Sequence, residues 1–223
     1  MASSSNDLHY RLTEESRRMY LPKHFEQNDP ELLLAFMQQY DFATLISVVD
    51  GAQFATHVPV LAREVDGVIR ISGHVARANP HWRGLQESPK ALLIFHGPHT
   101  YVSPALYTKP NRVPTWNYIA VHASGKATVD ESGNGKLAIL QELINHHEPE
   151  YHIQFEALEP DLRAALMQAI VGFTITVEQL QGKFKLGQHR LPENRPEMQA
   201  VHETGNENQR AIAQWMQRLG YWP

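Results

Sequence analysis

The stretch FATLISVVDGAQFATHVPVLAREVDGVIRISGHV, residues 42–75, decides the fold. It contains three runs rich in β-branched and aromatic residues, separated by Asp50-Gly51 and Asp66-Gly67. An Asp-Gly pair between such runs is typical of a tight hairpin turn. Because connections this short cannot contain a crossover helix, we expect the three strands to pair antiparallel.

Three more β-rich runs lie further along the chain. They begin at Lys90, Thr115 and Gly172, and a proline-marked loop, residues 105–114, separates the first two. Helices are predicted after Asp29-Pro30, from Asn79-Pro80, over 135–147, over 159–171, and from Asn206 to near the end of the chain.

Six or seven antiparallel strands with helices near both ends predict an α+β fold, a small closed β-barrel with flanking helices. A doubly wound sheet is disfavoured because strands and helices do not alternate.

Composition sets the broad class. The 223 residues include no cysteine, which excludes thiolate metal sites and a cysteine nucleophile. No apolar run approaches the roughly 20 residues needed to span a bilayer, and the expected location is the cytoplasm. The net charge of −4 does not indicate a nucleic-acid-binding protein, although a local basic patch stays open. We expect residues 1–18 to form a flexible tail and residues 19–223 to form one domain with C-terminal helices.

Three sequence patterns resemble catalytic or metal-binding motifs only in part. The GNGK at residues 133–136 lacks the flanking residues of a phosphate loop, because Asp130 and Leu137 stand where that motif needs Gly and Ser or Thr. His146-His147 and the other histidines form no HExxH and no spaced set of metal ligands, so no metal is predicted. No serine lies in a GxSxG elbow, and no catalytic residue is assigned.

The segment SGHVARANPHW, residues 72–82, is the first candidate site. A strand ends there and a helix begins, and the first turn of a helix offers backbone N–H groups to a phosphate. Arg77 would add a charge-assisted contact, and Ser72 and Asn79 would add neutral donors. The alternative interpretation is an ordinary turn in which Asn79 caps the helix and Arg77 is solvated.

Two further segments could surround a heterocycle. In VPTWNY, residues 113–118, Trp116 offers an aromatic face to a ring. The Asn117 amide can hydrogen-bond to both donor and acceptor edges of a heterocycle. In GKFKLGQHR, residues 182–190, Lys183, Lys185 and Arg190 gather positive charge beside Gln188. The alternatives are a core tryptophan and a solvated basic turn.

Taken in order, seven motifs resemble the PaiB family, described as FMN-binding negative transcriptional regulators. The motifs are MYLPKHF, ATHVPVL, SGHVARANPHW, FHGPHTYVSP, VPTWNY, AIVGF and GKFKLGQHR, spread over residues 19–195. The resemblance implies an FMN-binding split β-barrel, similar in fold to pyridoxamine phosphate oxidases. This chain departs from the usual family pattern at Gly187 and His189, where Ser and Asn are common.

The resemblance also implies a homodimer with FMN at the subunit interface. Ser72, Arg77 and Asn79, with His74 nearby, would lie around the phosphate, and Thr56 and His57 would lie along the flavin. Tyr101 and Ser103 would approach from the next strands. The remaining contacts, expected from the partner subunit, are Trp116, Asn117, Lys185 and Gln188.

Two functions follow from a bound flavin. By family resemblance, the protein is a negative transcriptional regulator that uses flavin as ligand or redox sensor, although no helix-turn-helix is evident in the sequence. Alternatively, it is a flavin-dependent oxidoreductase, similar to pyridoxamine phosphate oxidases or haem-utilisation proteins, in which histidines near the pocket transfer protons. The candidate histidines are His57, His74, His96, His99 and His122.

Overall fold

A computed structural model describes residues 19–222, and the expected tail at residues 1–18 lies outside them. The strands are β1 (Glu26–Gln27), β2 (Phe42–Val49), β3 (Ala52–Val65), β4 (Val68–Ala76), β5 (Lys90–Val102), β6 (Thr115–Asp130) and β7 (Ile170–Lys185). The helices are α1 (Pro30–Gln39), α2 (His81–Glu87), α3 (Gly133–His147), α4 (Tyr151–Glu156), α5 (Pro160–Gln168), α6 (Glu197–Glu203) and α7 (Glu207–Arg218). Short 3-10 turns are η2 (Lys23–Phe25), η3 (Pro104–Leu106) and η4 (Gln188–Glu193).

Six of the strands pair in a ring. The order β7-β4-β3-β2-β5-β6 is antiparallel throughout, and β6 pairs again with β7. Both predicted hairpin turns form, since Asp50, Gly51, Asp66 and Gly67 all have φ between 50° and 75°. Two successive residues with positive φ match the twist of the flanking strands. The predicted α+β fold with an antiparallel barrel is confirmed.

The ring encloses an apolar core. Leu45, Ile71, Phe95 and Phe173 are almost completely buried. Helix α1 starts at Pro30 under an Asp29 cap, as predicted, and buries Phe36 in the same core. No helix among residues 19–222 is long and apolar enough to cross a membrane.

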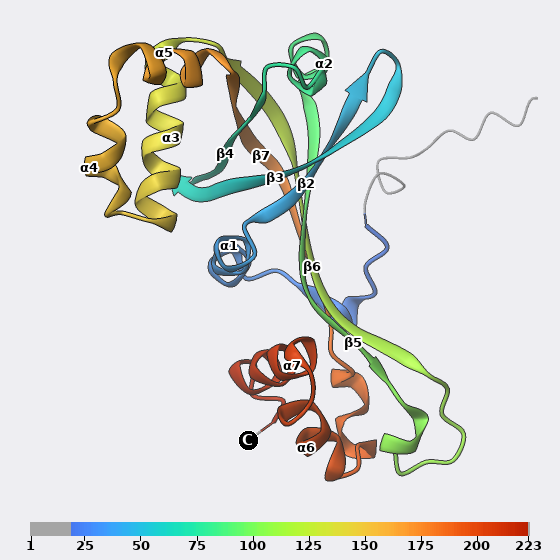
Figure 1. Ribbon diagram of the computed structural model, residues 1–223. Coiled ribbons are helices and arrows are strands. Elements are labelled where there is room, and N and C mark those ends of the chain that lie inside the picture. Colours follow the sequence, from blue (N-terminus) through green and yellow to red (C-terminus); the bar gives the residue numbers. More distant parts are fainter. Residues whose placement is uncertain (1–18, 223) are drawn as a thin grey trace, which may run out of the picture.

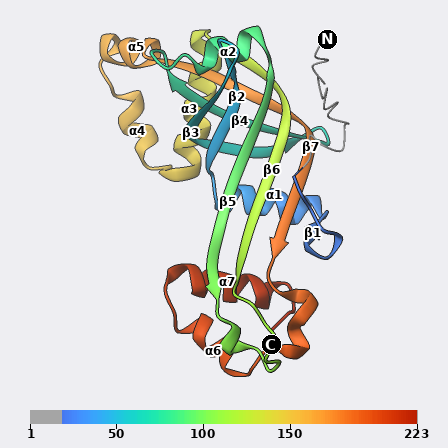
Figure 2. The same cartoon turned by 90° about the vertical axis from the view of Figure 1, so that its right-hand side faces the viewer.

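The two ends of the barrel carry different elements. Helix α2 lies at one end, close to the β2–β3 hairpin, and α3, α4 and α5 lie beside it (Figure 1). Strands β5 and β6 run on past the barrel to the other end, where α6 and α7 pack (Figure 2). This arrangement places the candidate segments of β4–α2 and of β6 far apart within one chain.

Three short elements were not predicted. Helices α4 and α6 have only 6 and 7 residues, too few for an apolar stripe to stand out from the sequence. Strand β1 has two residues, and it forms because Glu26 and Gln27 pair with Lys183 and Gly182 of β7. That contact depends on the folded barrel rather than on local sequence.

Candidate functional site

The predicted site residues fall into two groups. The first group lies on β3, β4 and the β4–α2 connection, and consists of Thr56, His57, Ser72, His74, Arg77 and Asn79. The second lies on β5, β6, β7 and η4, and consists of Tyr101, Ser103, Trp116, Asn117, Lys185 and Gln188.

Strand register measures the separation of these groups. Ser72 pairs with Thr174, and Thr174 pairs with Thr128 of β6. Trp116 lies twelve residues before Thr128 on the same strand. At about 3.3 Å per residue, this register places Ser72 about 40 Å along β6 from Trp116. By the other side of the barrel, His57 pairs with Thr44, Thr44 with Ile94, and Ile94 with His122, which is about 20 Å along β6 from Trp116. The strand register therefore separates Ser72 from Trp116 along β6 by more than it separates His57 from Trp116.

In the first group, a hydrogen-bonded unit joins β3 to the start of α2. The Asn79 Nδ2 donates to Thr56 Oγ1 at 3.1 Å, and His81 Nδ1 lies 2.8 Å from the same oxygen. The Asn79 Oδ1 accepts from the His81 backbone N–H at 3.0 Å. Asn79 therefore holds the helix start as a cap does, which is what the alternative interpretation described. We call Thr56, Arg77, Asn79 and His81 the α2 cluster.

His81 is the buried centre of the α2 cluster. Its side chain is completely inaccessible, and its Nε2 has no hydrogen-bond partner among the described residues. The Phe54 ring packs edge-on at 5.2 Å between centroids. Burial lowers the pKa of His81 to about 4, so the imidazole is neutral near pH 7.

Arg77 makes contacts outside the start of α2. Its Nη1 donates to Glu131 at 2.8 Å, its Nε donates to the Gln168 carbonyl at 2.9 Å, and its guanidinium lies 5.5 Å from the centroid of Trp82. The side chain is 38% exposed, and its polar contacts go to Glu131 and Gln168 rather than to the start of α2. The phosphate contact of Arg77 stays a prediction.

The remaining members of the first group differ in exposure. Ser72 is buried in β4, and burial lowers the pKa of the half-buried His74. His57 is exposed on β3, with Nδ1 3.0 Å from Thr44 Oγ1. None of these contacts identifies a ligand.

Two members of the second group, Asn117 and Lys185, line an open hollow of about 700 Å³, within the range of cofactor pockets. Lys183 and Lys185 extend from β7 on one face, opposite Ala120 and Tyr118 of β6. We define the lysine groove as Tyr20, Asn117, Tyr118, Lys183, Lys185 and Arg190, all of which line this hollow.

Aromatic rings and backbone carbonyls position the two ammonium groups. Lys183 Nζ donates to the Tyr20 carbonyl at 2.8 Å and lies 5.2 Å from the centroid of the Tyr20 ring. Lys185 Nζ donates to the Trp116 carbonyl at 2.7 Å. Desolvation, and then the charges of Lys183 and Arg190, lower the pKa of Lys185. Positive charge concentrated in a hollow favours an anionic or electron-rich ligand.

Asn117 brings an unpaired polar atom to the edge of the lysine groove. Its side chain is 3% exposed, and Oδ1 makes no hydrogen bond among the described residues. Gly187, with φ of 74°, lies beside it, so that the amide faces a position without a side chain. An unsatisfied buried acceptor costs about 1–3 kcal/mol unless a ligand supplies a donor. Asn117 lines the lysine groove and is suited to a heterocycle with an N–H edge.

Trp116 is not a core tryptophan. Its side chain is 51% exposed, and its ring packs edge-on against Tyr101, which is 48% exposed. The two rings form an uncovered aromatic surface at the far end of β5 and β6.

Ser103 and Gln188 have local roles. Ser103 caps η3 by accepting from the Ala105 N–H. Gln188 accepts from the Leu186 N–H at 2.9 Å and donates to the Phe184 carbonyl at 2.7 Å. The Gln188 amide is therefore already occupied in holding the turn after β7.

A second hollow, of about 550 Å³, adjoins the lysine groove and shares Tyr20, Tyr118 and Lys183 with it. His96 and His122 line it. Burial, and then the charges of His96 and Lys183, lower the pKa of His122. There is space here for a second small molecule beside a ligand in the groove.

Sequence reasoning placed Lys183 in a candidate basic segment but assigned a flavin contact to neither Lys183 nor Tyr20. Lys183 lies two residues before Lys185 and therefore on the same face of the strand, a signal that could have supported such a contact. Tyr20 carries no such signal, since the contact of the N-terminal segment with β7 depends on the tertiary structure.

Comparison with known proteins supports the flavin interpretation. Residues 19–179 match the family described as "Putative FMN-binding domain". The chain is 37% identical over 174 residues to the protease synthase and sporulation protein PAI 2 of Bacillus subtilis, covering 77% of this chain and 83% of that protein.

Solved structures support the fold. The flavocytochrome Anf3 of Azotobacter vinelandii aligns with a TM-score of 0.58 at 18% identity, over 74% of this chain and 72% of that one. The FAD and haem binding protein of Mycobacterium smegmatis aligns with a TM-score of 0.58 at 16% identity, over 82% and 81%. At these identities the similarity concerns the fold alone.

Proposed function

The chain belongs to the PaiB-type FMN-binding family, with FMN as its cofactor, and from this premise we propose that two copies bind FMN between them and use it as a ligand or redox signal in negative transcriptional regulation. The buried, unpaired Oδ1 of Asn117 in the lysine groove is the observation that carries the flavin site.

The interval of about 40 Å along β6 between the register positions of Ser72 and Trp116 supports a site shared by two copies. In a symmetric dimer, the α2 cluster of one copy can face the lysine groove of the other, because a two-fold axis brings different surfaces together in pairs. The flavin phosphate would then lie near Arg77 and the ring near Trp116 and Asn117. The exposed Tyr101 and Trp116 rings support this arrangement, because contact with a second copy or a flavin ring would cover them.

Noncovalent retention is sufficient for such a site. FMN has about 30 non-hydrogen atoms, and about 0.3 kcal/mol for each gives a dissociation constant below the micromolar range.

Titration of the flavin-stripped full chain with FMN tests the proposal, when flavin fluorescence and sedimentation velocity are followed together. We expect one FMN per chain and a dimeric species that carries the flavin. Tight binding of FMN by a monomer would refute the shared site, and no binding at all would refute the cofactor site.

The regulatory part of the proposal is supported by the name of the Bacillus subtilis relative, a protease synthase and sporulation protein. Helices α6 and α7 are joined by only three residues, the connection length typical of helix-turn-helix pairs. Helix α7 nevertheless carries two basic residues, Arg210 and Arg218, and the acidic Glu207 in its first turn, rather than a basic stripe.

Gel shift with promoter fragments at several salt concentrations tests direct DNA binding by the oxidised and the reduced flavoprotein. A complex that depends on flavin state and weakens as salt rises supports regulation through DNA contact. Equal and weak binding of all fragments would reject it.

A flavin-dependent oxidoreductase is the second candidate. The hollow beside the lysine groove favours it, because His122 and His96 border space for a substrate next to the flavin. A neutral imidazole can accept a proton during hydride or electron transfer. Anaerobic reduction by NADH or NADPH, followed by reoxidation in air, tests this activity. If neither nucleotide reduces the flavin, pyridine nucleotides are excluded as cosubstrates.

A cytoplasmic location is part of the same proposal. Cell fractionation followed by immunoblotting tests it, and recovery of the chain outside the cytoplasmic fraction would contradict it.

A further inference from the structure

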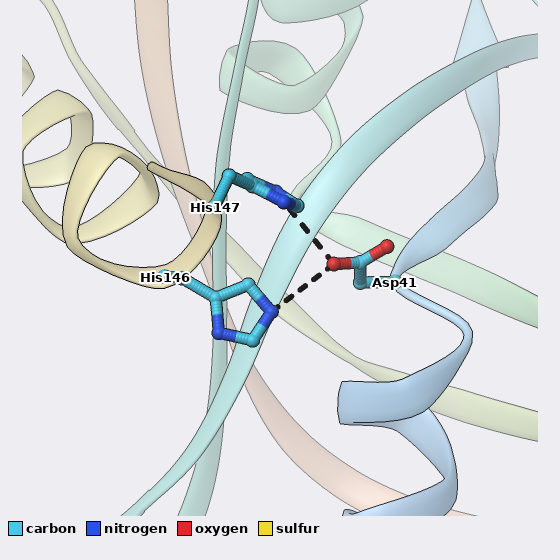
Figure 3. A group of neighbouring side chains, drawn as sticks. All are labelled: Asp41, His146 and His147. Carbon is cyan, nitrogen blue, oxygen red and sulfur yellow. Dashed lines mark hydrogen bonds and ion pairs between the residues drawn. The ribbon is translucent and has the colours of Figure 1, made fainter. Parts of the chain in front are cut away.

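Two adjacent histidines at the end of α3 point toward one carboxylate (Figure 3). The His146 Nε2 lies 3.2 Å from Asp41 Oδ2, and the His147 Nε2 lies 3.6 Å from the same oxygen. Asp41 stands between α1 and β2, 105 positions before His146. The sequence showed no spaced set of metal ligands here, because folding alone brings these residues together.

The three groups have the chemistry and spacing of a metal site. Imidazole nitrogen and carboxylate oxygen are common ligands of zinc and related divalent ions. In a tetrahedral site with metal–ligand distances near 2.0 Å, neighbouring ligand atoms lie about 3.3 Å apart. The two measured separations are close to this value, and the ligand atoms of all three residues lie within 4.8 Å of one another.

Strand β3 fixes both sides of the cluster. The Val60 backbone N–H donates to the Asp41 carbonyl at 2.9 Å. The next residue, Leu61, forms a buried apolar cluster with Ile139 and Leu143 of α3. Adjacent residues of one strand therefore hold Asp41 and the end of α3 in place, so that little ordering is needed when an ion binds.

The cluster is open to solvent on one side. The side chains of Asp41, His146 and His147 are 22%, 33% and 48% exposed. An ion can enter from solution, and three protein ligands leave a position for water, as in zinc sites with an open coordination position. A simple ion pair needs only one imidazole for the carboxylate, whereas here a second is directed at the same oxygen.

We propose that Asp41, His146 and His147 bind one divalent transition-metal ion of the zinc class. The ion links the C-terminal end of α3 to the junction between α1 and β2. Because it binds the folded chain, it stabilises that chain in proportion to its concentration and affinity.

Zn²⁺ titration of the chelator-treated, dialysed full chain by calorimetry tests the proposal, with Co²⁺ absorption as a second probe. We expect one ion per chain, visible bands typical of tetrahedral Co²⁺, and a melting temperature that rises with Zn²⁺. Asp41→Asn, His146→Gln and His147→Gln should each weaken Zn²⁺ binding by at least about 100-fold, because loss of an outer-shell partner already costs 10- to 100-fold.

His152→Gln on α4 is the matched control, and it should bind Zn²⁺ as the parent chain does. Circular dichroism of each variant without metal verifies folding, and Asp41→Asn retains the size of the side chain at that position. Unchanged Zn²⁺ stoichiometry in the His146→Gln/His147→Gln double variant would overturn the proposal, as would a parent chain that binds no Zn²⁺.

Discussion

The α2 cluster and the lysine groove are both rich in polar side chains, but the hydrogen bonding of those side chains differs. In the α2 cluster, hydrogen bonds join Thr56 to Asn79 and both residues to His81, whose buried Nε2 has no partner among the described residues. In the lysine groove, Asn117 keeps an unpaired buried oxygen beside Lys185 and an open hollow. The hydrogen bonds of the first region hold the start of α2, whereas the unpaired oxygen of the second region borders an open hollow.

From this difference we expect substitutions in one region to change stability and substitutions in the other to change flavin binding. Variants in the α2 cluster should act through folding, with the phosphate contact of Arg77 as the untested exception. Variants in the lysine groove should act through flavin affinity. The following expectations test this division, from the largest effect to the smallest.

The largest effect concerns acid stability and His81. Its pKa is about 4 in the folded chain and 6.5 in the unfolded chain, so the unfolded chain takes up the proton first as pH falls. Stability should drop between about pH 6.5 and pH 4, by on the order of 3 kcal/mol from this residue. Urea unfolding at several pH values across this range measures how steeply the free energy of unfolding depends on pH.

His81→Gln should flatten that slope, whatever its effect at neutral pH. His57→Gln is the control, because His57 is exposed and follows Thr56 on β3. This variant should retain the pH dependence of the parent chain. An unchanged slope in the His81 variant would mean that His81 does not drive the acid response.

Lys185→Met should weaken FMN binding by about 10- to 150-fold, because a hydrogen bond to a charged group contributes about 1.5–3 kcal/mol. The aliphatic stem is retained, so packing changes little. Fluorescence titration measures the affinity. Lys126→Met removes an exposed lysine that pairs with Glu178 on the barrel, and equal weakening in that variant would assign the effect to net charge instead.

Asn117→Ala and Gln188→Ala form a matched pair of amide deletions. Asn117→Ala should lower FMN affinity about tenfold with little change in melting temperature, since its Oδ1 makes no hydrogen bond with residues 19–222. Gln188→Ala should mainly lower the melting temperature, since its amide holds the Phe184–Leu186 turn. Reversal of this pattern would contradict the roles assigned to both residues.

Trp116→Ala should produce the smallest effect, a loss of about 1 kcal/mol in flavin affinity from one aromatic contact. The half-exposed ring contributes little to the core, so thermal unfolding should shift less than flavin binding. If stability falls as much as affinity, Trp116 is a packing residue.

Local pattern predicted the barrel well. The two Asp-Gly turns, the Asp29 cap of α1 and the long strands are encoded within a few residues each. The candidate segments were also predicted, but the roles of individual residues were not. Whether Gln188 faces a ligand or its own turn depends on hydrogen bonds that sequence spacing does not fix. The meeting of Asp41 with His146 depends on tertiary packing across more than a hundred residues.

The central claim is that one flavin site combines the α2 cluster of one copy with the lysine groove of the other. Mixed dimers of Arg77→Glu and Lys185→Glu chains, isolated through two different tags, test it most directly. Each homodimer of variant chains should bind no FMN. The mixed dimer has one site built from two parent halves, so we predict one FMN per dimer, half of the parent content. Mixed dimers without FMN, or Arg77→Glu homodimers with full FMN content, would contradict the account.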